Sequence, residues 1–447
     1  MKFIADTKDL EKYIGKKIQK NFSIIKGIST DSRSLKKDYI FLAIKGKNFN
    51  GNDYVDEALK KGAVIAIVDD KRFINSKNTK IIYVKNSILA LGKITKNIIK
   101  EYNGKVIAIT GSNGKTSTTS IISQTIKGSS STIKNYNNEI GMPLSVINAS
   151  SKSNALILEI GASKFNDINY LSKILSPNIG IITNIGNSHL ETLKNTNGVL
   201  RVKSEIINNI KSNGYLIVPS ENKKHIDYWK NIRSDIKVFT FGMSKAADFF
   251  PTKINFNEKR ISFYINSKHL KANIYINTFL VGEHNIKNIL ASFIVHYCLN
   301  LNLEKFAMII NSKNLKNIRL TKTKWIRGST LINDSYNANP DSAKKSIDLL
   351  SCYKKRTFFI LGDMLELGRY RKKLHKNIGE YANAKGIDFL IGYGELAKHA
   401  VDSFGKNGIF FKKEEELKVY LKENVTSKDV ILIKGSRGMK MERFINV

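Results

Sequence analysis

The stretch Thr110-Gly111-Ser112-Asn113-Gly114-Lys115-Thr116 follows the apolar run 106–109. A buried strand, a glycine-rich turn and a helix that begins with Lys-Thr are typical of a phosphate-binding loop, because glycines let backbone N–H groups approach an anion and the helix N-terminus adds partial positive charge. In such a loop Lys115 reaches the β- and γ-phosphates of a nucleotide, and the hydroxyl of Thr116 lies on Mg²⁺. The other interpretation is a turn that merely contains Gly-Lys-Thr, and the strand before it argues against this. The predicted nucleotide contacts of the loop are Gly111, Asn113, Gly114, Lys115, Thr116 and Ser117.

The composition limits the class of protein. The chain has 447 residues, of which 42% are hydrophobic, so two to four domains with buried cores are expected. Lys and Arg total 74 against 38 Asp and Glu, a formal charge of +36, which can attract nucleic acid, acidic membranes or anionic substrates. The basic residues are dispersed and form no basic arm or stripe. We therefore interpret most of them as solvated surface residues and expect no nucleic-acid partner.

Cysteines and apolar runs bear on the compartment. Cys298 and Cys352 lie in apolar contexts without metal-ligand spacing, which favours a reducing compartment without disulfides. Charged residues at Lys2 and Asp6 come before any hydrophobic region of signal-peptide length. The longest apolar runs, such as 63–68, have the length of strands, so no membrane span is expected. The sequence predicts a soluble cytoplasmic protein.

Three α/β domains are expected, with boundaries at residues 1–84, 85–311 and 312–447. In the second domain, strand-sized apolar runs alternate with helical stretches, which is typical of a parallel, doubly wound sheet. The third domain shows the same alternation and is expected to be Rossmann-like. A small β-rich patch at 236–280, which includes 237–241, interrupts this alternation in the second domain. The predicted strands are 40–44, 63–68, 155–160, 179–185, 215–218, 357–361, 389–391 and 430–433, and the predicted helices are 87–102 and 285–300.

Two further residues lie at the predicted carboxyl edge of the sheet that carries the phosphate loop. Glu159 ends the run 155–159, and ligands of open parallel sheets bind beyond the carboxyl ends of the strands. A carboxylate there can hold the Mg²⁺ of a bound nucleotide, whereas the alternative is an acid that caps the next helix. His189 follows the next strand; a lone His is more often structural, but its place beyond the same edge favours a ligand role. The sequence has no nucleophile paired with a base and no zinc spacing, so we expect chemistry through ATP and a metal.

Other polar stretches follow predicted strands or begin helices. Asn137 and Asn138 lie in a polar loop that offers donors and acceptors to a substrate, although a plain loop is the alternative in this Asn-rich chain. Asn285 and Asn288 share one face of a helix and are suited to a base edge. Lys203 is, on spacing alone, an ordinary lysine of a helix surface.

Taken in order along the chain, these motifs resemble the Mur ligase family. The short phosphate loop T-G-x-x-G-K-T, with Ile109 in place of the usual first glycine, occurs in this family and in folylpolyglutamate synthases. The latter place the loop nearer the N-terminus and have no Thr-Asp-Ser-Arg domain before it. The resemblance covers nearly the whole chain. Its most specific pieces are Asn137-Asn138-Glu139-Ile140-Gly141, Asp334-Ser335-Tyr336-Asn337-Ala338-Asn339-Pro340, Leu361-Gly362-Asp363-Met364-Leu365-Glu366-Leu367-Gly368 and Lys434-Gly435-Ser436-Arg437.

The resemblance implies roles for individual residues. Lys115, Glu159, His189 and Lys203 would be catalytic, and Thr116, Glu159, His189 and Lys203 would hold metal. Lys203 matches the lysine that is carbamylated in this family, a change that turns an ammonium into a carboxylate-like group able to support a second Mg²⁺. The other residues implied to bind ATP are Asn285, Asn288, Asp334 and Arg319, the last without its usual preceding Gly. Those implied to bind the UDP-sugar, peptide or dipeptide substrates are Thr30, Asp31, Ser32, Arg33, Asn137, Asn138, Tyr336, Asn337, Asn339, Lys434 and Arg437.

The implied activity is an ATP-dependent amide ligation of peptidoglycan synthesis by a monomer that uses two Mg²⁺ ions. The terminal carboxylate of UDP-N-acetylmuramoyl-tripeptide would attack the γ-phosphate of ATP, and the amine of D-alanyl-D-alanine would then displace phosphate from the acyl phosphate, with the third domain closing to exclude water. The alternatives are a Mur ligase that adds diaminopimelate or lysine, a folylpolyglutamate-type ligase, an ATP-gated nucleic-acid-binding protein and a catalytically inactive scaffold. The first typically carries Asp-Tyr-Ala-His-Thr-Pro-Asp where this chain has the stretch 334–340.

Overall fold

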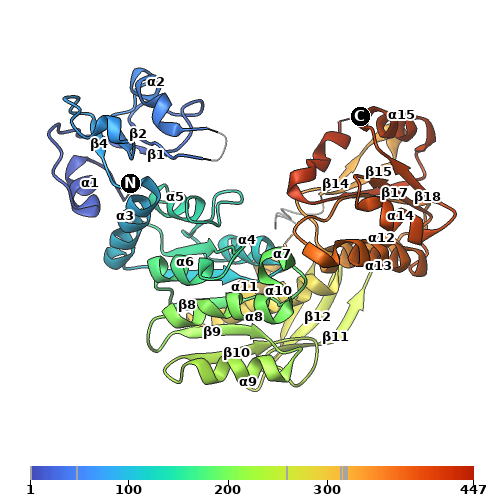
Figure 1. Cartoon of the computed structure of the whole chain (residues 1–447). Helices are drawn as coiled ribbons and strands as arrows, with labels where there is room; N and C mark the ends of the chain where they lie inside the picture. The colour runs from blue at the N-terminus through green and yellow to red at the C-terminus, as the bar shows by residue number, and fades with distance from the viewer. Residues whose placement is uncertain (1–2, 47–48, 258–259, 313–314, 316–320, 447) are drawn as a thin grey trace.

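The computed structural model describes residues 3–46, 49–257, 260–312, 315 and 321–446. These residues form three α/β domains in chain order, each built around its own main sheet, as the sequence predicts (Figure 1). The N-terminal and C-terminal domains lie on opposite sides above the central domain in this view. No described helix is both long enough and apolar enough to cross a lipid bilayer.

The N-terminal domain has a four-stranded parallel sheet in the order β1-β2-β3-β4. Two of its strands were predicted and are confirmed within a few residues, β2 (Tyr39–Leu42) and β3 (Ile65–Val68), because their side chains are almost all buried. The other elements are α1 (Thr7–Ile14), β1 (Gly27–Ser29), α2 (Val55–Lys60) and β4 (Ile81–Tyr83).

The central sheet is parallel throughout and has the order β10-β9-β8-β5-β7-β6. Its strands are β5 (Lys105–Thr110), β6 (Ser130–Ser131), β7 (Ala155–Glu159), β8 (Ile179–Ile182), β9 (Tyr215–Pro219) and β10 (Lys237–Phe241). Strand β5 lies between β7 and β8, so the loop that follows it opens at the point where the strand order reverses, which is where ligands bind in such sheets.

Both faces of the central sheet are covered, which explains its continuous apolar strands. Successive residues of β5 enter different cores: Val106 and Ala108 belong to one, and Ile107 and Ile109 to the other. The first core includes α3 (Ser87–Glu101), α5 (Gly141–Ile147), α6 (Asp167–Leu175) and α8 (Thr196–Ser204), and it continues into the N-terminal domain. The second is completed by α4 (Lys115–Thr125), α10 (Glu283–Cys298) and α11 (Leu303–Asn311).

The predicted β-rich patch is only partly correct. Strands β11 (Phe250–Phe256), β12 (Ile261–Asn266) and β13 (Ile274–Thr278) form a separate antiparallel sheet. Residues 237–241, which we assigned to this patch, are instead β10, the edge strand that pairs in parallel with β9. The crossover between them is α9 (Lys223–Ile232), of which Trp229 alone is buried. The short, lysine-rich segment that forms α9 was not predicted to be a helix, so the β-α-β unit was not recognised from the sequence.

The C-terminal domain has a six-stranded sheet in the order β14-β15-β19-β16-β17-β18, in which β14 alone is antiparallel to its neighbour. The predicted strands correspond to β16 (Thr357–Gly362), β17 (Phe389–Tyr393) and β19 (Val430–Lys434). The other strands are β14 (Thr321–Lys324), β15 (Thr330–Asp334) and β18 (Gly408–Phe411). Helices α12 (Pro340–Ser351), α13 (Arg371–Ala384) and α14 (Ala397–Phe404) cover one face, and α15 (Glu414–Asn424) contributes to the other.

Candidate functional site

The glycine-rich loop after β5 is held in shape from the neighbouring strand end. The N–H of Asn113 donates to Oδ1 of Asn184 at 2.8 Å, and the hydroxyl of Thr183 donates to the carbonyl of Asn113 at 2.5 Å. Gly111 has φ +142°, and a Cβ there would lie 1.9 Å from Oγ1 of Thr183. Gly114 precedes α4 with φ +83°, and a Cβ there would lie 2.7 Å from Oδ1 of Asn288. The loop therefore needs both glycines, and the N-terminus of α4 keeps its backbone donors available for an anion.

Three side chains around this loop carry charge or hard oxygen atoms. Nζ of Lys115 donates to the carbonyl of Gly111 at 2.5 Å, so the lysine is folded over the loop. The Thr116 hydroxyl lies 3.3 Å from Oε2 of Glu159, whose side chain is buried at the end of β7. A hydroxyl and a carboxylate oxygen beside a phosphate site are the ligands that Mg²⁺ prefers, so these residues fit that ion. No group of three His, Cys, Asp or Glu gathers in the described ranges, and Mg²⁺ on a nucleotide needs only one or two protein oxygens.

Lys203 lies on α8 and is almost completely buried, with 1% of its surface exposed. Burial, together with the nearby positive charge of Lys115, lowers its pKa to about 7, against the opposing effect of Asp167 and Glu205. A lysine with a lowered pKa loses its proton more readily, and its uncharged amine is nucleophilic. The helix position that seemed ordinary in the sequence is thus an interior one.

His189 immediately precedes α7 (Leu190–Leu193) and has a left-handed backbone, φ +52°. Its Nδ1 lies 2.6 Å from Oε2 of Glu366, a residue of the C-terminal domain. The backbone N–H of Glu191 donates to the carbonyl of Glu366 at 3.1 Å. The ring beside it lowers the pKa of the Glu366 carboxyl. The two domains are therefore in contact at a predicted metal ligand.

One cavity of about 890 Å³ gathers most of the predicted residues from the central and C-terminal domains. It runs from the phosphate loop past the polar loop 135–139 and the segment 161–167 to the loop after β15. The predicted site residues that line it are Asn113, Gly114, Lys115, Thr116, Asn137, Asn138, Glu159, His189, Tyr336, Asn337, Asn339 and Arg437. A smaller cavity of about 130 Å³ adjoins it, and its predicted residues are Ser117, Asn285, Asn288, Asp334 and Lys434, together with Asn113 and Gly114.

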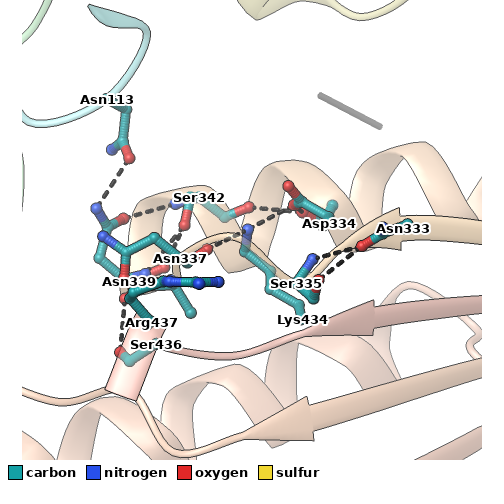
Figure 2. A network of polar contacts seen from close by, with 12 residues as sticks. Asn113, Asn333, Asp334, Ser335, Asn337, Asn339, Ser342, Lys434, Ser436 and Arg437 are labelled. Carbon is teal, nitrogen blue, oxygen red and sulfur yellow. Dashed lines mark hydrogen bonds and ion pairs between the residues drawn. The ribbon is translucent and has the colours of Figure 1, made fainter. Parts of the chain in front are cut away.

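The C-terminal domain meets the phosphate loop through a polar network (Figure 2). Nδ2 of Asn339 donates to Oδ1 of Asn113 at 2.8 Å across the domain boundary. Asn339 also caps α12 by accepting from the N–H of Ser342. Behind it, Nζ of Lys434 donates to the carbonyl of Asn337 at 3.1 Å. The loops after β15 and β19 thus form one wall that faces the nucleotide-binding loop.

Some predicted residues are not gathered at these cavities. Thr30, Asp31, Ser32 and Arg33 follow β1 in the N-terminal domain and line neither of them. Arg33 holds the carboxylate of Asp31 with two hydrogen bonds of 2.9 Å, and these lower the pKa of Asp31. Arg319 lies in 316–320, outside the described residues.

Three residues that line or support the site, Asp341, Lys345 and Glu366, were not singled out from the sequence. Oδ2 of Asp341 accepts from the backbone N–H of Asn187 at 2.8 Å, and Lys345 lines the smaller cavity. Glu366 stood in a quoted motif, but no role was assigned to it. Asp341 directly follows a helix-initiating Pro, which was a usable signal, whereas the others depend on how two domains pack together.

Comparisons with known proteins agree over nearly the whole chain. Three family models match it: "Mur ligase family, catalytic domain" at residues 24–128, "Mur ligase middle domain" at 109–296 and "Mur ligase, glutamate ligase domain" at 319–437. The UDP-N-acetylmuramoyl-tripeptide–D-alanyl-D-alanine ligase of Buchnera aphidicola subsp. Baizongia pistaciae is 34% identical over 426 residues, which cover 94% of this chain and 91% of the relative.

Two solved structures also match over most of their length. MurF from Acinetobacter baumannii has a TM-score of 0.86 at 26% identity, covering 99% of this chain and 95% of the other. The MurF ligase from Thermotoga maritima, solved in complex with ADP, has a TM-score of 0.81 at 26% identity, covering 94% and 96%.

Proposed function

Because this chain belongs to the Mur ligase family, we propose that it joins D-alanyl-D-alanine to UDP-N-acetylmuramoyl-tripeptide and converts ATP to ADP and phosphate. The observation that carries this proposal is the 890 Å³ cavity, in which the phosphate loop, Glu159 and His189 face Asn337, Asn339 and Arg437 of another domain. The named relative and both solved neighbours support the choice of the dipeptide.

In the first step a carboxylate oxygen of the tripeptide attacks the γ-phosphorus of ATP, and ADP leaves. Lys115 and the N-terminal N–H groups of α4 bind the phosphates and neutralise charge that develops on the transferring group. Because the transferred group needs no protein nucleophile, positioning and electrostatics supply the catalysis.

In the second step the amine of D-alanyl-D-alanine attacks the acyl carbon, phosphate leaves, and the amine loses a proton. The wall formed by Tyr336, Asn337, Asn339 and Arg437 excludes water from the acyl phosphate, which water would otherwise hydrolyse. Arg437 presents a guanidinium that suits the carboxylate of the incoming dipeptide.

The oxygen atoms of Thr116 and Glu159 fit one Mg²⁺ ion, and we propose two ions, which would supply charge neutralisation for the phosphates. Thr116 and Glu159 would hold one of them. His189 and a carbamylated Lys203 would hold the other. The neutral amine of Lys203 adds to CO₂ with loss of a proton to give a carbamate, and its pKa of about 7 supports this reaction.

We place the domain boundaries at 84/85 and 311/312. Strand β4 ends at Tyr83, and α3, which contacts α5 and α6 of the central domain as well as α1, begins at Ser87. Helix α11 ends at Asn311. Residues 1–84 then bind the UDP-sugar portion through Thr30 to Arg33, and residues 312–447 bind the dipeptide. A matched pair tests the first assignment: Arg33→Ala should raise the KM for the UDP-linked substrate, whereas Arg72→Ala, in an exposed ion pair of the same domain, should not.

The experiment that tests the function is phosphate release from ATP with the UDP-linked tripeptide and different amine acceptors. D-alanyl-D-alanine should support release, whereas D-alanine, L-lysine and diaminopimelate should not. Release with a single amino acid would assign the chain to another branch of the family. We further propose a cytoplasmic monomer, since ATP is available there and one chain supplies the whole cavity; cell fractionation and light scattering test both points.

A further inference from the structure

We propose that Glu366 is a positioning residue of the active site. From the C-terminal domain it holds the His189 ring through Nδ1, so that Nε2 is presented to the phosphate site only while the two domains are in contact. The inference rests on the proposed role of His189 as a metal ligand. It adds a residue that reaches the metal through another side chain.

Glu366 contacts one particular nitrogen of the His189 ring, Nδ1. Oε2 of Glu366 lies 2.6 Å from Nδ1 of His189. Nδ1 is buried, and within the described part of the chain no group makes a well-aligned hydrogen bond to it. The carboxylate of Glu366 is the charged group that faces it. The side chain of His189 is 29% exposed and lines the large cavity. One ring nitrogen is therefore turned to the neighbouring domain, which leaves the other for the cavity.

The segment that carries Glu366 is docked on α7 and does not merely approach it. The N–H of Glu191 donates to the carbonyl of Glu366 at 3.1 Å. Gly368, with φ +54°, lies so close that a Cβ there would be 3.0 Å from Cα of Glu191. Leu190 on one side and Leu367 on the other are both buried. Backbone, packing and side-chain contacts thus fix the same relationship between the two domains.

Both residues of the pair have left-handed backbones, φ +52° for His189 and φ +63° for Glu366. A residue other than Gly in this region costs of order 1–3 kcal/mol and persists only where the surroundings hold it. Such residues gather at ligand sites and switch regions. Two of them that face each other across a domain boundary point to a contact with a function beyond packing.

The chemistry of metal-binding histidines explains that function. A ligating His usually presents its other ring nitrogen to a carboxylate or carbonyl, which selects the tautomer, fixes the ring and raises its basicity. Loss of such a partner typically lowers metal affinity about 10- to 100-fold. Because Glu366 belongs to the C-terminal domain, its docking makes the metal site complete only in the closed arrangement.

Mn²⁺ binding in the presence of ADP, followed by electron paramagnetic resonance, tests the proposal without turnover. Glu366→Ala should weaken the binding at least about tenfold. Glu366→Gln keeps an oxygen that can face Nδ1, so it should bind more tightly than Glu366→Ala. The matched control is Glu380→Gln on α13, an exposed glutamate paired with Lys376, which should bind as the wild type does.

The ring nitrogens of His189 give a second readout in the metal-free protein. With ¹⁵N-labelled histidine, and His189→Gln to assign the signal, the wild type and Glu366→Gln should show the Nδ1–H tautomer, and Glu366→Ala should show a mixture. Equal Mn²⁺ binding by the wild type and Glu366→Ala, or an unchanged tautomer in Glu366→Ala, would overturn this inference alone. Failure of the wild type to bind Mn²⁺ with ADP would overturn it together with the metal role of His189.

Discussion

Nζ of Lys434 lies 2.5 Å from Oδ2 of Asp334 in the interior of the C-terminal domain. Asp334 and Lys434 lie opposite each other at the carboxyl ends of the parallel strands β15 and β19. The side chain of Asp334 is 10% exposed and that of Lys434 is 2% exposed. Ser346 of α12 donates to the same carboxylate oxygen at 2.7 Å. The pair therefore joins the two loops that present Asn337 and Arg437 to the large cavity (Figure 2).

Replacement of either Asp334 or Lys434 alone should destabilise the C-terminal domain. Lys434→Met leaves the buried carboxylate of Asp334 without its cation, and we expect the C-terminal domain to lose about 3–5 kcal/mol of stability. The double variant Asp334→Leu/Lys434→Met removes both charges and should recover most of the loss. Differential scanning calorimetry of the three proteins measures both effects.

A different outcome would support the role that the sequence suggests for Lys434. If Lys434→Met keeps the wild-type unfolding transition but raises the KM for D-alanyl-D-alanine, the lysine contacts substrate and the pair is not structural. The control is Lys440→Met, an exposed lysine of the same C-terminal segment, which should change neither quantity.

Lys115→Ala should abolish ATP turnover and leave the fold intact. The lysine extends over the loop carbonyls, so its removal takes away the cation that faces the phosphates but empties no core position. We expect phosphate release to fall by about three orders of magnitude. Lys105→Ala, at the exposed first residue of β5, the strand before the loop, is the control. Near-normal turnover by Lys115→Ala would remove the basis for the phosphate-loop assignment.

The sequence was sufficient to predict those site residues that the central sheet alone positions. The strand before the loop and the one that ends at Glu159 are apolar on both faces, so their carboxyl ends were predictable, and the structure places Lys115, Glu159 and His189 around one cavity. The glycine positions were predictable for the same reason, since a helix follows the turn directly.

The sequence was not sufficient to predict the contacts between domains. The closeness of Glu366 to His189 depends on the packing of two separate cores and on two left-handed residues, neither of which is Gly. The burial of Lys203 depends on helices far from it in the chain, and its own helix spacing looks ordinary. Edge strand β10 was assigned to the wrong sheet because the short helix α9 before it was not predicted.

The buried amine of Lys203 should make stability depend on pH. Its pKa is about 7 in the folded chain and near 10.5 when unfolded, so the unfolded chain binds more protons between these values. The free energy of unfolding should rise with pH in this window, by at most about 1.4 kcal/mol per pH unit. Below pH 7 the full penalty of burying the charge remains, and above 10.5 it disappears.

Lys203→Met isolates this effect. Its stability advantage over the wild type should be largest at pH 7 and should shrink as the pH approaches 10, in buffers free of CO₂. Trp229 reports on the correct domain, since it is fully buried and donates to Oγ of Ser204 at 2.7 Å. The other tryptophan, Trp325, is replaced by Phe in both proteins. A constant difference across the pH range would contradict a depressed pKa.

Gly186→Ala should disturb the contact between the central and C-terminal domains. A Cβ at this position would lie 2.2 Å from Oδ2 of Asp341, the oxygen that accepts from the N–H of Asn187. Either that hydrogen bond breaks or α12 moves away from the loop that carries His189. Because small displacements of catalytic groups are costly, we expect the rate of phosphate release to fall about tenfold or more.

Removal of the clashing carboxylate distinguishes a steric cause from a general weakening of the loop. Asp341→Ala alone loses one hydrogen bond and should reduce the rate less than Gly186→Ala does. In the double variant the added methyl group has room, so its rate should return to that of Asp341→Ala. Small-angle scattering with ADP bound should show the expanded form only for Gly186→Ala. If the double variant stays as slow and as expanded as Gly186→Ala, the glycine is required for the backbone of the loop and not for the approach of Asp341.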